Sequence, residues 1–139
     1  MAETAQFADD VAAALRGACA AAAPREFVGL LGGRRAGATW RVEALALVPN
    51  GAAATDAFAV APADFAAAEA ALRAAGHDWL GFAHGHPRAE ATPSARDRAA
   101  FWPDCLQAIV GGEAFSELRV FWRDAGGCRE LACVAAEAL

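Results

Sequence analysis

Short apolar segments, separated by glycine or proline, restrict the fold of this sequence more than any other feature. Hydrophobic residues make up 57% of the 139 residues, but 42 residues are alanine, and Arg, Asp, Glu or Gly interrupts each long apolar stretch. No stretch approaches the roughly 20 apolar residues that a membrane-spanning helix needs. A chain of this length can bury one core of ordinary size. We therefore expect a single domain, residues 1–139, with no membrane partner.

Two kinds of periodicity alternate along the chain and predict an α/β fold. Helical spacing of apolar residues predicts helices over residues 4–22 and 62–75. Ser94 can cap a third helix that runs through Trp102. Runs of apolar or β-branched residues predict strands, with a hairpin turn at 34–37. The expected strands are residues 27–31, 39–48, 58–60, 79–86, 106–110, 118–122 and 131–134.

Charge and cysteine content exclude several classes of protein. All 12 basic residues are arginine, the net charge is −5, and no basic cluster occurs, which argues against nucleic acid as a partner. The N-terminus lacks the basic start and apolar core of a secretory signal. The four cysteines form no C-x-x-C pair, so we expect small buried hydrophobes in a reducing compartment. These features predict a cytoplasmic location.

Two of the three histidines lie one residue apart at the end of a predicted strand. Alternate side chains of a strand share a face, so His84 and His86 point the same way, which suits two imidazoles on one metal ion. Ser94 and Asp97 lie three residues apart at a predicted helix start and share a face of its first turn. Asp97 could therefore supply a carboxylate ligand. Two nitrogens and one carboxylate oxygen, with water in the fourth place, are typical of an open catalytic zinc site.

Hydrolysis at such a site also needs a base and a donor for the oxyanion. Glu26, at the start of the first predicted strand, is the candidate base. Ser94 stands beside the candidate ligand Asp97 and is the candidate donor. These residues predict a hydrolytic metal centre.

Other metal-site classes fit the sequence less well. An amidohydrolase barrel also opens with H-x-H, but it needs roughly 250 residues. Nucleobase deaminases need H-x-E and P-C-x-x-C, and neither pattern is present. The H-E-x-x-H pattern of another protease class is absent as well.

The two histidines, the serine and the aspartate are spaced as in the JAMM motif, E…H-x-H-x7-S-x-x-D. The chain thus resembles the MPN+ (JAB1/MPN/Mov34) zinc metalloproteases. Residues 24–33, PREFVGLLGG, resemble the family's segment P-x-E-x-x-G-L-L-x-G, which carries its catalytic glutamate. The resemblance covers most of the chain, from about residue 6 to residue 110. The aromatic-proline sequence at 101–103 is similar to small bacterial members.

This resemblance implies a fold and a set of roles. The implied fold is a single MPN (JAB) domain: a mixed, mostly antiparallel, curved β-sheet flanked by helices, with a cytidine-deaminase-like architecture. His84, His86 and Asp97 would bind one Zn²⁺ per chain. Glu26 would serve as general base and then as acid toward the leaving amine. Ser94 would stabilise the tetrahedral intermediate.

The resemblance also implies an activity and a partner. Members cleave after the C-terminal glycine of a ubiquitin-like protein, whose extended Gly-Gly tail would lie along a sheet edge. Two alternatives stay open: trimming of a ubiquitin-like sulfur carrier in cysteine or thio-metabolite biosynthesis, and a non-catalytic MPN scaffold. Trp102 could line the cleft and contact the substrate. Gly85 replaces a serine that many members carry; it is no ligand, so we expect activity to survive. The sequence leaves the oligomeric state open.

Overall fold

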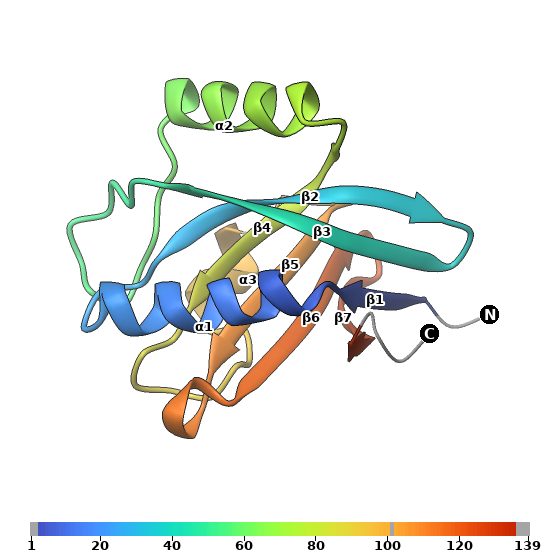
Figure 1. The fold of residues 1–139 in the computed structure, drawn as a ribbon. Coiled ribbons are helices and arrows are strands. Elements are labelled where there is room, and N and C mark those ends of the chain that lie inside the picture. Colours follow the sequence, from blue (N-terminus) through green and yellow to red (C-terminus); the bar gives the residue numbers. More distant parts are fainter. Residues whose placement is uncertain (1–2, 101, 136–139) are drawn as a thin grey trace.

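Seven strands pair around a ring in the part of the chain that the computed structural model describes, residues 3–100 and 102–135 (Figure 1). The order around the ring is β1-β3-β2-β4-β5-β6-β7, and β7 returns to β1. The strands are β1 (Thr4–Phe7), β2 (Val28–Ala36), β3 (Thr39–Val48), β4 (Asp78–Gly85), β5 (Leu106–Gly111), β6 (Glu117–Asp124) and β7 (Gly127–Ala135). The helices are α1 (Asp9–Ala22), α2 (Pro62–Ala74) and α3 (Ala95–Ala100), with a 3₁₀ turn at Glu113–Phe115.

The first strand closes this ring. β1 pairs parallel with β3 on one side and parallel with β7 on the other. β4 and β5 are also parallel, whereas β2–β3, β2–β4, β5–β6 and β6–β7 are antiparallel. The expected mixed sheet is therefore confirmed, but the strands form a closed barrel instead of a curved open sheet.

The sequence prediction of a helix from residue 4 is wrong for its first turn. Thr4–Phe7 form β1, and the helix begins only at Asp9. Ala5, Gln6 and Phe7 are buried on both faces of the strand, between two paired neighbours. Long-range pairing thus decides the conformation of these four residues, although the alanine-rich segment that follows them is helical.

The glycine pair at 32–33 lies inside a strand and does not end it. β2 continues to Ala36, and the register with β3 shifts between Gly32 and Gly33. Gly33 has a φ of 155°, and a Cβ there would lie 1.8 Å from the carbonyl oxygen of Arg41. Only glycine allows the two backbones to approach so closely. The expected hairpin at 34–37 therefore moves to the turn at residues 37–38.

Two helices cover opposite faces of the β2–β4 pair. Leu31 and Ala83 pack into the larger core, with Val11 and Leu15 of α1. Their neighbours along the strands, Leu30 and Phe82, face the other way and pack with Leu72 and Phe65 of α2. Figure 1 shows α1 and α2 on either side of these strands. None of the described helices is both long and apolar enough to cross a membrane.

The four cysteines are free thiols, and they differ in burial. Cys19 and Cys105 are buried, as expected, but Cys133 is only half-buried and Cys128 is exposed. Cys128 is the second residue of β7 and directly follows the turn between β6 and β7. The expectation of four core cysteines is thus wrong for Cys128.

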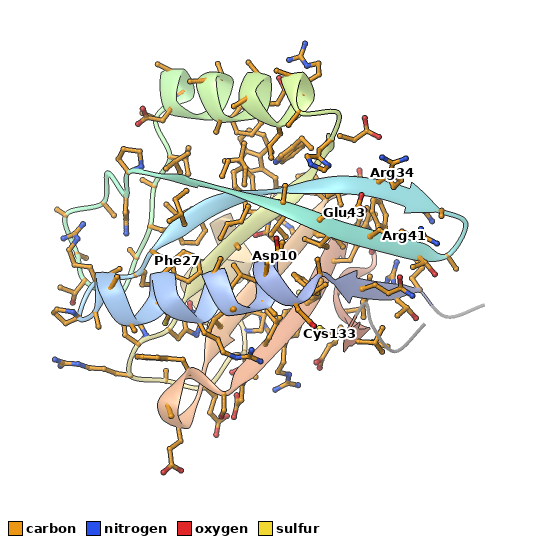
Figure 2. All side chains as sticks on the ribbon, viewed as in Figure 1. Asp10, Phe27, Arg34, Arg41, Glu43 and Cys133 are labelled. Atoms are coloured by element: carbon orange, nitrogen blue, oxygen red, sulfur yellow. The ribbon has the colours of Figure 1, made fainter. Side chains whose placement is uncertain are left out.

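Gly85 has a packing role on β4. Its neighbours along the chain, His84 and His86, point to one face, so a Gly85 side chain would point to the other. There a Cβ would lie 2.7 Å from Cys19 Sγ and 2.7 Å from two ring carbons of Phe27. Phe27 lies against α1 (Figure 2). The space that a serine would need in this chain is therefore already filled.

We predict that Gly85→Ala destabilises the protein. The new methyl group would overpack Phe27 and Cys19, and the free energy of unfolding should fall by about 1–3 kcal/mol. Urea denaturation of chelator-treated protein measures this change. Gly17→Ala is the matched control: nothing lies within 4 Å of a Cβ there, in the middle of α1. It should raise stability by about 0.5–1 kcal/mol. Wild-type stability of Gly85→Ala would show that the neighbouring side chains yield without cost.

Candidate metal centre

Side chains from three segments of the chain meet at one end of β4. His84 is the next-to-last residue of β4, His86 follows the strand, Asp97 lies in the first turn of α3, and Glu26 precedes β2. All four residues are buried, with at most 7% exposed. One ligand atom of each lies within 4.8 Å of those of the other three. The structure thus brings together the candidate ligands and the candidate base that the motif singled out.

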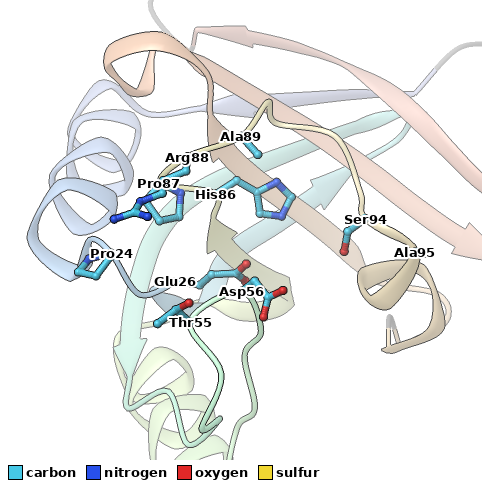
Figure 3. Close-up of a pocket in the computed structure, with 10 residues that line it drawn as sticks. All are labelled: Pro24, Glu26, Thr55, Asp56, His86, Pro87, Arg88, Ala89, Ser94 and Ala95. Carbon is cyan, nitrogen blue, oxygen red and sulfur yellow. The ribbon is translucent and has the colours of Figure 1, made fainter.

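The register of β2 against β4 explains this meeting. In this antiparallel pair, Val28 lies opposite His84. The chain that enters β2 therefore runs beside the chain that leaves β4. Glu26, two residues before Val28, comes beside His86 in this way. Figure 3 shows Glu26 and His86 on the same cleft.

The two imidazoles and the Asp97 carboxylate have the spacing of zinc ligands. Asp97 Oδ2 lies 3.2 Å from His84 Nε2 and 2.9 Å from His86 Nε2, and the two nitrogens are 3.2 Å apart. Ligand atoms that sit 2.0–2.1 Å from a tetrahedral zinc ion are about 3.3 Å from each other. The three atoms therefore fit one face of such a coordination sphere.

A backbone carbonyl sets the tautomer of one histidine. His86 Nδ1 lies 2.8 Å from the carbonyl oxygen of Glu90, which can only accept. Nδ1 therefore donates the hydrogen bond, and the lone pair of Nε2 turns toward His84 and Asp97. With His84 in the tautomer that also leaves Nε2 unprotonated, two nitrogen lone pairs and the Asp97 carboxylate would converge on one point, where a cation would remove their mutual repulsion. This donor set fits a divalent metal ion.

Burial and mutual contacts shift the pKa values of the three candidate ligands. Burial lowers the pKa of His84, which favours the neutral imidazole that a metal needs. Burial also opposes a charge on His86, but Asp97 and the Glu90 carbonyl outweigh it and raise the pKa. Burial alone would raise the pKa of Asp97, yet its contacts with both histidines hold that pKa below the usual range. Asp97 is therefore an ionised carboxylate.

The start of α3 holds Asp97 in place. The Ser94 N–H donates to Asp97 Oδ2 at 3.0 Å, and the Asp97 N–H donates to Ser94 Oγ at 3.0 Å. This reciprocal pair caps the helix and orients the carboxylate. The helix ends at Ala100, earlier than expected, and Trp102 is not helical. Phe101 lies outside the described residues.

A cleft of about 410 Å³ opens beside the metal centre (Figure 3). Glu26, His86 and Ser94 line it, so the candidate base, one candidate ligand and the candidate oxyanion donor face the same space. Its remaining lining residues are Pro24, Thr55, Asp56, Pro87, Arg88, Ala89 and Ala95. Trp102 is not among them. It is half exposed and lines a second pocket.

Asn50 fixes the loop that forms one wall of this cleft. Its Nδ2 donates to the carbonyl oxygens of Glu26 at 2.9 Å and Ala57 at 3.0 Å. Its Oδ1 accepts from the N–H groups of Ala52 at 2.9 Å and Ala59 at 3.1 Å. Sequence analysis did not single out Asn50 as a site residue. An asparagine between proline and glycine signals a turn, but its bond to Glu26 depends on tertiary structure.

The same loop presses an aromatic ring against one of the histidines. Phe58 stacks on His84 with ring centroids 4.5 Å apart and planes 29° apart. Residues 58–60 were expected to form a strand, but they belong to the loop. No local pattern announces this contact, because it joins a loop residue to the end of β4. The Phe58 ring shields one side of His84 from water.

We predict that Asp97→Asn weakens zinc binding by more than about 100-fold, because loss of a ligand charge should exceed the 10–100-fold cost of altering a residue behind a ligand. A titration against a competing chelator measures the affinity. Asp56→Asn is the matched control, since Asp56 lines the cleft but lies outside the ligand group. Its zinc affinity should stay within a few-fold of wild type. Equal affinities for both variants would contradict the assigned ligand.

Comparisons with known proteins place this geometry in a family. Residues 8–124 match the family model for prokaryotic homologues of the JAB domain. A Desulfitobacterium hafniense protein of known solution structure is 28% identical, with a TM-score of 0.86 over 94% of this chain and 92% of that one. A JAB1/MPN domain protein from Archaeoglobus fulgidus is 20% identical, with a TM-score of 0.57 over 93% of this chain and 98% of that one.

A third structure, described as a metalloprotease-like zinc site in the proteasome and signalosome, is 18% identical. Its TM-score is 0.57 over 96% of this chain and 99% of that one. No curated protein gives a significant match. Because the family model spans most of the chain and the fold agrees, the chain belongs to the family of prokaryotic JAB-domain proteins.

Proposed function

We propose that this chain is a zinc-dependent peptidase that cleaves after the C-terminal glycine of a ubiquitin-like protein. One observation supports the hydrolytic part: the buried candidate ligands His84, His86 and Asp97 lie within 4.8 Å of the buried carboxylate of Glu26. A scaffold that only binds partners does not need a base beside the ligands. The similar fold described as a metalloprotease-like zinc site supports the choice of metal.

The residues around the cleft divide the work of hydrolysis. Bound zinc would polarise the scissile carbonyl and lower the pKa of a water molecule beside it. The Glu26 carboxylate would accept a proton from that water and deliver it to the leaving amine. Ser94 Oγ accepts the N–H of Asp97, so its own hydrogen is available for the oxyanion.

The barrel changes where the substrate tail would lie. Each described strand has a neighbour on both sides for at least part of its length, which leaves little free sheet edge for the tail, chiefly in β3 beyond Val42. We place it in the cleft between the loop that carries Thr55 and Asp56 and the loop that carries Pro87 and Ala89. Glycine suits this approach because it carries no side chain to meet these walls.

We predict that Glu26→Gln keeps its zinc but loses about 10²–10⁴-fold in hydrolysis, because the amide cannot accept the proton of water. The substrate is a ubiquitin-like protein with a Gly-Gly tail and a short C-terminal extension, ideally one encoded near this gene. Intact mass measurement follows the release of the extension, and metal analysis verifies zinc. Equal rates for Glu26→Gln and wild type would contradict the assigned base. Absence of cleavage by the zinc-loaded wild type would favour a binding scaffold.

We predict that Asn50→Ala slows hydrolysis by about tenfold or more while zinc binding stays intact. Loss of four hydrogen bonds frees the loop from the Glu26 backbone, and a misplaced base costs rate. Rates and zinc affinity are measured on the same preparations. Asp64→Ala, on the first turn of α2, is the control for a surface change outside the cleft. A wild-type rate of hydrolysis by Asn50→Ala would contradict the role of Asn50 in positioning Glu26.

A further inference from the structure

An aromatic pocket of about 300 Å³ lies on the far side of the loop that borders the metal cleft. Phe58 in the loop, Phe65 on α2, Phe82 on β4 and Trp102 before β5 form its walls, and Gln107 of β5 contributes an amide. The rings of Phe65, Phe82 and Trp102 contact each other, with centroids 5.1–5.8 Å apart. Trp102 is 50% exposed, so the pocket has an open rim.

Gln107 is the unusual member of this pocket. In the β4–β5 pair it lies beside Phe82, and only 1% of it is exposed. Its Nε2 donates to Cys105 Sγ at 3.6 Å, and that thiol in turn donates to the Trp102 carbonyl at 3.7 Å. Its Oε1 is buried and has no hydrogen-bond partner among the described residues. Buried acceptors are rarely left without a donor, so this oxygen can accept a hydrogen bond from water or from a donor group that enters the pocket.

The neighbouring thiol keeps the amide in this orientation. Burial raises the pKa of the Cys105 thiol to about 11, so the thiol keeps its proton and donates to the Trp102 carbonyl. The sulfur lone pairs then face the amide nitrogen of Gln107, which donates to them. The amide oxygen is left as the one side-chain acceptor among the described residues that line the pocket.

The pocket is close enough to the metal centre to take part of a bound polypeptide. Phe58 lines the pocket, and its ring stacks on the candidate ligand His84. A single ring therefore separates the two sites. A chain that places a carbonyl at the metal can place one of its side chains behind Phe58.

We propose that this pocket binds a tyrosine or tryptophan side chain of the substrate, whose O–H or N–H donates to Gln107 Oε1. Flat rings match walls made of Phe65, Phe82 and Trp102. An ammonium group carries three donors and a guanidinium five, more than one acceptor can satisfy. A wholly apolar side chain would leave the oxygen buried and unpaired. This proposal rests on the proposed function in one respect: it assigns the bound tyrosine or tryptophan to the substrate.

Fragment binding to the full chain carrying Glu26→Gln tests this site without any hydrolysis. The probes are p-cresol, which represents tyrosine, and toluene, which lacks the hydroxyl. We expect p-cresol to shift the NMR signals of the Trp102 indole and the Gln107 amide. It should also bind roughly five- to tenfold more tightly than toluene, as expected for one added neutral hydrogen bond. Equal affinities of the two probes, or unchanged pocket signals, would overturn the proposal.

Two variants assign the preference to particular groups. Gln107→Met keeps the side-chain length but removes the acceptor, so p-cresol and toluene should bind equally. Trp102→Leu removes an exposed wall and should weaken both probes alike, and it covers the case in which Gln107→Met does not fold. A preference for p-cresol that survives in Gln107→Met would overturn the assigned acceptor. If the fragments bind as expected but the zinc-loaded wild type cleaves no substrate, the result would contradict the proposed hydrolysis and leave the pocket assignment intact.

Discussion

The antiparallel pairing of β2 with β4 is the constraint on which the site depends. It sets Val28 opposite His84, so the entry to β2 and the exit from β4 lie at the same end of the barrel. A shift of one residue would turn His84 to the opposite face, away from Asp97. This register brings Glu26 close to the histidines. The first turn of α3 then orients Asp97, and the hydrogen bond from Asn50 holds the backbone of Glu26.

Because β4 is buried on both faces, the metal centre and the core limit each other. On one face, four ionisable side chains are buried away from water. Such burial is unfavourable unless hydrogen bonds or opposite charges replace the lost hydration. The Glu90 carbonyl, the Ser94 N–H and the contacts among the ligands supply part of that compensation, and a metal ion would supply the rest. On the other face, Phe27 and Cys19 pack against the bare backbone of Gly85. A serine at position 85 of this chain would meet these two side chains.

Much of this architecture could be predicted wherever the information is local. β3 has the predicted bounds, and α2 ends within one residue of its prediction. The periodicity of apolar residues and the turn residues at the ends decide these bounds. The spacing of the histidines, Ser94 and Asp97 is likewise local, whereas Glu26 is far from them in sequence and was the candidate base for its place at a strand start, which the resemblance then supported. Strand β1 and barrel closure could not be predicted, because they depend on pairing with β3 and β7. Asn50 and Phe58 were missed for the same reason: their partners are distant in sequence.

The loop between β3 and α2 connects the features that sequence analysis missed. Asn50 ties this loop to the backbone of Glu26, and Phe58 on the same loop stacks on His84. The far side of the loop lines the aromatic pocket. A side chain held in that pocket would press Phe58 toward His84 and keep the loop seated over Glu26. Since these contacts are contiguous, substrate recognition and the position of the base would depend on the same loop, and binding energy from a remote side chain could then help to position the base.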